Sequence, residues 1–167
     1  LILLVQVEDG VLAQQRPVAR LFRRSAQRIF KYGAGSDDAD FGGLSGLIVS
    51  AAGARFLAIT DSSNRLTGTL TYRDGRLAGL SGTEIAPLLD IKGHALSGKD
   101  GDAEGLTGSL DGDVFVSFER DHRIWRYPFG KDGLAAKPVP VKTPSALKQA
   151  PDNGGLEGIA QLANGRL

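Results

Sequence analysis

The sequence predicts an all-β protein, a β-propeller of four-stranded antiparallel blades of which about two and a half are present. Three observations support this fold class. The 167 residues include 23 glycines and 7 prolines, scattered among short apolar runs, a composition typical of turn-rich β proteins. Apolar runs of strand length alternate with tight-turn sequences. Finally, one pattern recurs after 59 and then 53 residues, a period typical of propeller blades.

The first predicted blade consists of four strands joined by short turns. Small and polar residues at 51–53 and 62–64 separate the first three strands. An Asp-Gly pair at the centre of 73–76 predicts a tight hairpin into the fourth. The expected strands are 44–50, 55–61, 66–72 and 77–80.

The second predicted blade repeats this order, and a third begins near the end of the chain. Its turns are expected at 111–112 and 131–133, and its strands at 104–110, 114–119, 122–127 and a last segment ending near Val141. A third copy opens at 155–160 and turns at 164–165. Since rings need about four to eight blades and the sequence contains no methionine, we expect a fragment of a longer product, truncated at its C-terminus.

Residues 1–40 are predicted to form an N-terminal segment that precedes the propeller domain at 41–167. The apolar start and residues 11–15 resemble a signal-peptidase site, with an ordinary strand as the alternative. Residues 16–30 carry five arginines. They are compatible with a basic amphipathic helix at an acidic lipid surface or with an edge strand or short surface helix bearing solvated arginines. No apolar stretch reaches 18 residues, so we expect no transmembrane segment.

Composition excludes several classes of function. The formal charge of +1, from 20 basic and 19 acidic residues, gives no global field for binding nucleic acid. The sequence contains no cysteine, which excludes a disulfide framework and cysteine-ligated metals.

The openings of the three copies align on a glycine. They read LSGL at 44–47, AEGL at 103–106 and LEGI at 156–159. Ser45 therefore corresponds to two glutamates at the start of an innermost strand. It does not match the G-x-S-x-G turn of a hydrolase nucleophile, because a strand is expected to follow it.

Carboxylates recur at two positions of the repeat. Glu104 and Glu157 open their copies, while Asp61 and Glu119 end the second strands. Carboxylates that converge on one axis repel each other unless some are protonated or a cation neutralises them. Oxygen ligands without cysteine favour a hard cation such as calcium. For Asp61 and Glu119, turn capping or pairing with nearby arginines is the alternative.

Basic residues follow the second acidic position, in the segment SFERDHRIWRY. Arg120 and Arg123 are candidates for binding an anionic substrate, because the guanidinium fork suits phosphate oxygens; salt bridges to blade acids are the alternative. His122 is a candidate acid, base or substrate-binding residue, with a structural role in a turn as the alternative.

Six segments together resemble the phytase-like family, described as the "esterase-like activity of phytase". They are FGGLSGLIVS (41–50), ARFLAITDSSNRLTGTL (54–70), IAPLLD (85–90), DAEGL (102–106), VSFERDHRIWRYP (116–128) and DNGGLEGIAQLANGRL (152–167). The resemblance implies a periplasmic or secreted bacterial propeller with phosphodiesterase- or phytase-like hydrolase activity. Carried over by position, it points at Asp61, Asp102, Glu104, Glu119, Arg120 and Glu157.

These observations lead to one main functional hypothesis. A calcium ion in the channel, held by Glu104, Glu157, Asp61 and Asp102, is expected to bind and polarise a small phosphoester. Glu119 is expected to orient or deprotonate water and Arg120 to stabilise the developing charge. The alternatives are a lactonase or carboxylic esterase on the same calcium propeller and a non-catalytic propeller that binds a ligand or a protein. The full-length protein is expected to be a monomer.

Overall fold

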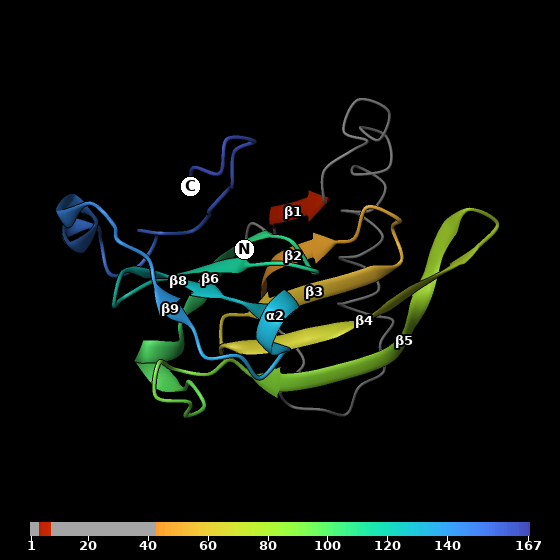
Figure 1. Ribbon diagram of the computed structural model, residues 1–167, viewed down its shortest axis with the longest axis horizontal. Coiled ribbons are helices and arrows are strands. Elements are labelled where there is room, and N and C mark those ends of the chain that lie inside the picture. The colour runs from red at the N-terminus through yellow and green to blue at the C-terminus, as the bar shows by residue number, and fades with distance from the viewer. Residues whose placement is uncertain (1–3, 8–42) are drawn as a thin grey trace.

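The computed structural model describes residues 4–7 and 43–167, and strands dominate this part of the chain (Figure 1). The strands are β1 (Leu4–Val7), β2 (Leu44–Val49), β3 (Arg55–Thr60), β4 (Asn64–Arg73), β5 (Arg76–Pro87), β6 (Ala103–Gly108), β7 (Val114–Phe118), β8 (Arg123–Tyr127) and β9 (Val139–Pro140). The helices are short: α2 (Phe129–Asp132) and the 3₁₀ turns η1 (Gly98–Gly101) and η2 (Ser145–Gln149). The all-β fold class is confirmed.

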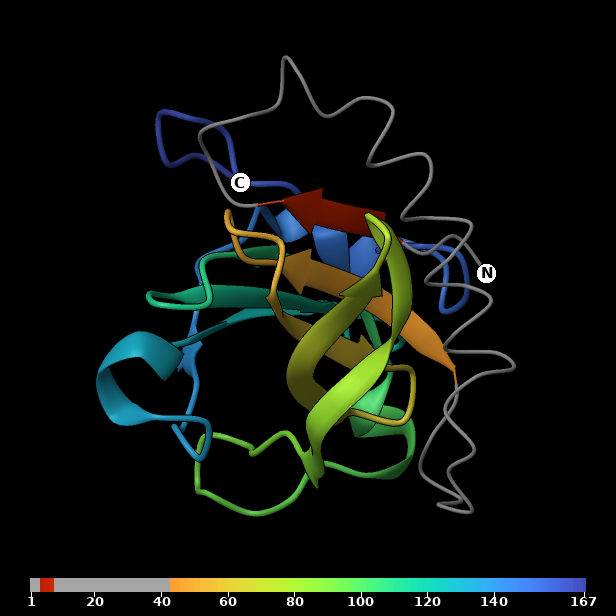
Figure 2. The ribbon, with the colours of Figure 1, turned by 90° about the vertical axis from the view of Figure 1, so that its right-hand side faces the viewer.

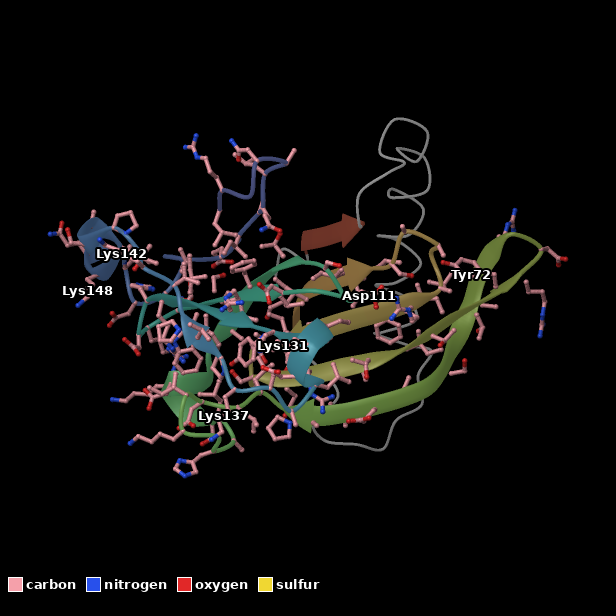
Figure 3. All side chains as sticks on the ribbon, in the orientation of Figure 1. Tyr72, Asp111, Lys131, Lys137, Lys142 and Lys148 are labelled. Carbon is pink, nitrogen blue, oxygen red and sulfur yellow. The ribbon has the colours of Figure 1, made fainter. Side chains whose placement is uncertain are left out.

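The first sheet has the order β1-β2-β3-β4-β5. Strands β2 to β5 form the predicted antiparallel meander, and β1 adds a parallel strand at the edge beside β2 (Figure 2). The hairpin at 73–76 forms as predicted, with Arg73 paired to Arg76. Strand β5 is longer than expected, because its pairing with β4 continues back to Asn64. The β4–β5 hairpin, which carries Tyr72, projects from the body of the molecule (Figure 3).

The second sheet is antiparallel with the order β6-β7-β8-β9. Strand β9 is only two residues long and ends at a proline. Prolines lack the amide hydrogen that a ladder needs, which explains why this edge strand is so short. Residues 131–133 do not turn directly into a strand as expected, since Phe129–Asp132 first form the short helix α2.

The two sheets share the same local irregularity between their first and second strands. The pairing of β2 with β3 shifts between Leu44 and Gly46, and that of β6 with β7 shifts between Ala103 and Gly105. The extra residues are therefore Ser45 and Glu104, in agreement with the alignment of the repeat openings. A β-bulge of this kind redirects the side chain of the extra residue.

The same glycine contact joins successive copies. A Cβ added at Gly46 would lie 2.5 Å from Leu106 Cβ, and one added at Gly105 would lie 2.9 Å from the backbone nitrogen of Ile159. Each glycine thus allows the opening segment of the next copy to approach closely. Strand β6 lies beside β2, and the 156–161 segment lies beside β6.

The main core lies between the two sheets. Ile48, Leu57 and Ile59 from the first sheet pack with buried residues of the second: Leu106, Val114, Val116, Phe118 and Tyr127. Across this interface, Arg55 Nη2 lies 2.6 Å from an Asp111 carboxylate oxygen. A second apolar cluster, with Leu47, Phe56 and Leu66, belongs to the first sheet alone.

The third copy does not form the expected strand. Residues 155–160 have no strand assignment, although Ile159 is buried and the Gln161 amide donates to Thr107 Oγ1 at 2.9 Å. The turn at 164–165 does form, with the Leu162 amide donating to the Arg166 carbonyl. In the described residues no sheet closes on itself. Except for β1, the predictions for residues 1–40 lie outside the described residues.

Candidate functional site

Three carboxylates meet at one end of the second sheet. Asp102 immediately precedes β6, Glu104 is the bulged residue of β6, and Glu119 immediately follows β7. The Glu119 amide donates to the Asp102 carbonyl at 2.9 Å, which closes this end of the strand pair. One carboxylate oxygen from each residue lies within 4.8 Å of the other two. We call Asp102, Glu104 and Glu119 the acidic cluster.

The ionised form of Glu104 is disfavoured by burial and by the acids around it. Burial and then the charges of neighbouring carboxylates raise its pKa to about 7, from an ordinary value of 4.5. The contributing neighbours, largest effect first, are Asp102, Glu119, Glu157 and Asp61. At neutral pH the site therefore favours either a proton on Glu104 or a cation near it.

Glu119 is the most deeply placed acid of the cluster, with only 2% of its surface exposed. Its Oε1 accepts a hydrogen bond from the Leu156 amide at 3.2 Å. Two residues earlier, in β7, Ser117 Oγ donates to the Leu156 carbonyl at 3.3 Å. Both backbone polar groups of Leu156 are thus bound by the β7 end, which fixes the Glu119 carboxylate against the third copy.

Arg120 lies next to the cluster in a conformation that is uncommon for a side chain of its size. Its φ is +58°, in the left-handed region. Its Nε lies 2.6 Å from Asp102 Oδ2, while 57% of the side chain remains exposed. Residues held in such a conformation concentrate at functional sites. The guanidinium therefore reaches the acidic cluster and still presents donors to solvent.

A cavity of about 670 Å³ opens over these groups. It is lined by Asp102, Glu104 and Arg120, together with Asp61 and Asn153. A second cavity of about 660 Å³ is also lined by Arg120, together with Lys99 and Asp152. The size of the first cavity suits a small-molecule ligand.

Two other predicted acids lie at the margin of the site. Asp61 lines the first cavity, and its carboxylate lies so close to Gly43 that an added Cβ would be 2.2 Å from Oδ1. Glu157 is exposed. Both contribute negative potential at Glu104, but neither belongs to the acidic cluster.

Ser45, at the position equivalent to Glu104, is a buried structural residue. It is 1% exposed, and its Oγ donates to the Gly43 carbonyl at 3.2 Å. This geometry agrees with the rejection of Ser45 as a nucleophile.

The predicted substrate-binding residues Arg123 and His122 contact protein groups. The Arg123 guanidinium lies 4.0 Å from the centre of the Phe118 ring and 4.3 Å from that of Trp125, and it donates to the carbonyls of Asp121 and Asp100. Burial lowers the pKa of Arg123. His122 Nε2 lies 3.1 Å from the Ala150 carbonyl and 2.9 Å from that of Pro151.

Sequence reasoning missed two participants in the site. Asn153 lines both cavities, and the Leu156 backbone amide binds Glu119. The repeat pattern draws attention to carboxylates and not to a loop asparagine, and a backbone amide carries no side-chain signal. Neither could be found from the repeat pattern.

The assembled groups suit one type of chemistry. Three carboxylates that provide only oxygen donors fit a hard divalent cation such as calcium. Arg120 adds a directed donor for an anion beside them. No helix in the described part of the chain combines the length and apolar character that a bilayer crossing requires.

Residues 39–167 match the model of the phytase-like family, whose description is esterase-like activity of phytase. The search of curated proteins returned no match. The search of solved structures also returned none.

Proposed function

Because the chain belongs to the phytase-like family, we propose that it is a hydrolase of small phosphoesters that works with a divalent cation, calcium by its ligand chemistry. The observation that carries the proposal is the acidic cluster beside Arg120. One carboxylate oxygen from each of the three acids lies within 4.8 Å of the other two, and Asp102, Glu104 and the partly exposed Arg120 line one cavity of about 670 Å³. This arrangement offers a place for a cation and an anion together.

Asp102, Glu104 and Glu119 are the residues that would hold the cation. Burial and then the repulsion of the neighbouring carboxylates raise the pKa of Glu104, and a bound cation would relieve both effects. When bound, a divalent ion would neutralise these carboxylates and polarise a phosphoryl or acyl oxygen.

Arg120 and Asp61 are assigned the remaining roles. The exposed donors of Arg120 would bind the phosphate and stabilise the negative charge that develops on it. The acceptor of the water proton is assigned to Asp61, which lines the same cavity outside the acidic cluster. This assignment departs from the sequence-based hypothesis, in which Glu119 had that role, since Glu119 is buried and bound by the Leu156 amide.

The two sheets are proposed to be successive blades of a propeller. Three features support this architecture: the shared bulge at Ser45 and Glu104, the equivalent bonds from Asp61 to Gly43 and from Glu119 to Asp102, and the repeated glycine contact. In a propeller the first strand of each blade lines the central channel. The acidic cluster would then lie at a channel mouth.

The test uses protein purified without metal and assayed on a phosphate diester, a phosphate monoester and a carboxylic ester, with calcium and with chelator. The variants are Glu104→Gln and Asp102→Asn, and the control is Asp74→Asn in the distant β4–β5 turn. We expect phosphoester turnover that needs calcium, falls at least about 100-fold in both cluster variants, and is unchanged in the control.

Two other outcomes would contradict the proposal in different ways. Turnover of the carboxylic ester alone would replace it with the lactonase or carboxylic esterase alternative, which the family description also favours. No turnover of any substrate by folded, calcium-treated protein would contradict hydrolysis and favour a non-catalytic ligand-binding protein.

A further inference from the structure

His122 forms hydrogen bonds to the loop of residues 150–156. It immediately precedes β8, and its Nε2 lies between two carbonyl oxygens, 3.1 Å from Ala150 and 2.9 Å from Pro151. Carbonyls only accept hydrogen bonds, so Nε2 must carry the proton. Among the described residues, the buried Nδ1 has no hydrogen-bond partner. The ring therefore acts as a single donor shared by two acceptors.

The loop is packed tightly against the same ring. A Cβ added at Gly155 would lie 2.5 Å from the Pro151 carbonyl oxygen and 2.7 Å from His122 Cε1. Only glycine fits between the imidazole and the loop backbone at this distance. The next residue is Leu156, whose amide donates to Glu119 Oε1 at 3.2 Å. A continuous set of contacts thus joins His122 to the acidic cluster.

We propose that His122 is a positioning residue that orients the Glu119 carboxylate through the 150–156 loop. Its Nε2–H anchors the loop at Ala150 and Pro151, and the anchored loop presents the Leu156 amide to Glu119. The consequence for cation binding rests on the proposed function. Groups that orient a metal ligand typically contribute about 10- to 100-fold to metal affinity.

Two amide variants separate this role from simple packing. In His122→Gln, the side-chain nitrogen is the same number of bonds from Cβ as Nε2, so it can donate to the same carbonyls. In His122→Asn the nitrogen corresponds to Nδ1 and does not reach them. The two variants differ by one methylene and are both neutral amides. Gly155→Ala is a third variant, which displaces the loop while the histidine remains.

The first measurement is amide hydrogen exchange in metal-free protein, with amides of the core strand β7 as internal reference. In His122→Asn and in Gly155→Ala, we expect the Leu156 amide to exchange about tenfold faster while the β7 amides keep their protection. In His122→Gln we expect the wild-type exchange rate. The second measurement is calcium affinity by calorimetry, where we expect about tenfold weaker binding in His122→Asn and near wild-type binding in His122→Gln.

The outcomes distinguish this inference from the proposed function. Unchanged Leu156 exchange in both His122→Asn and Gly155→Ala would overturn the positioning role, whatever the calcium data show. Faster Leu156 exchange in these two variants, together with a wild-type protein that binds no calcium, would support the positioning role but overturn the cation site. If His122→Asn also loses β7 protection, the Leu156 exchange rates of the other two variants decide the question. A wild-type rate in His122→Gln with a faster rate in Gly155→Ala supports the positioning role, and equal rates in the two variants overturn it.

Discussion

Replacing Glu104 with glutamine should stabilise the metal-free protein at alkaline pH. The native pKa of Glu104 is raised to about 7, first by burial and then by the surrounding carboxylates. The folded state therefore retains a proton on Glu104 at pH values where the unfolded chain has lost it. Stability from this group is lost as pH rises from about 4.5 towards 7, and the loss is complete above that. Glutamine carries no charge and avoids this loss.

The size of the effect follows from the pKa. One pKa unit corresponds to about 1.4 kcal/mol, so a rise from 4.5 to about 7 sets an upper limit of about 3 kcal/mol. Glu104 is only partly buried, and solvent screening reduces the effect. We expect Glu104→Gln to raise the free energy of unfolding by about 1–2 kcal/mol at pH 8 and to leave it unchanged at pH 4.

Urea denaturation of both proteins with chelator, at pH 4 and pH 8, measures this difference. Asp74→Asn is the matched control, because Asp74 is an exposed turn residue and should show no such pH-dependent gain. A Glu104→Gln protein that is less stable than wild type at pH 8 without metal would refute the reasoning. It would mean that the Glu104 charge is stabilised by the fold rather than opposed by it.

Three further predictions concern the cation, the arginine and the glycine contacts. Calcium should raise the melting temperature more at pH 8 than at pH 5, because protonated Glu104 competes with the cation; equal shifts in a thermal scan would contradict this. Arg120→Gly should change the free energy of unfolding by less than about 1 kcal/mol, since relief of the left-handed backbone offsets an exposed ion pair, while kcat/KM for a phosphoester falls about 100-fold or more. Gly105→Ala should cost about 1–3 kcal/mol in urea denaturation, because its Cβ would clash with Ser117 Oγ and would lie 2.9 Å from the Ile159 nitrogen. In Gly158→Ala, the added Cβ would have no neighbour within 4 Å in the described part of the chain, so its free energy of unfolding should stay within about 0.5 kcal/mol of wild type. Equal costs for the two alanine variants would contradict the packing argument.

Local sequence was sufficient to predict most of the strands and part of the site. Strands β2, β3, β7 and β8 lie within a residue or two of their predicted bounds, because short apolar runs between turn residues leave few alternative conformations. The 59-residue repeat predicted that Glu104 occupies the position equivalent to Ser45. It also related Asp61 to Glu119, since repeated units fold alike.

Tertiary packing decided which of the predicted residues meet. Asp102, Glu104 and Glu119 form the acidic cluster, while Asp61 and Glu157 remain outside it. The Arg120–Asp102 pair depends on one left-handed residue, a conformation that few sequence signals predict.

The contrast between His122 and Arg120 shows the physical reason for the division. The two residues lie in one turn and were both candidates for substrate binding, yet His122 donates to the backbone of residues 150 and 151, and Arg120 reaches a cavity. The sequence by itself determined the β architecture, the repeat and the acidic positions, because these depend on short-range alternation and turn chemistry. Only the tertiary structure decided the partners of the charged and polar side chains, because those contacts join segments that are distant in the chain.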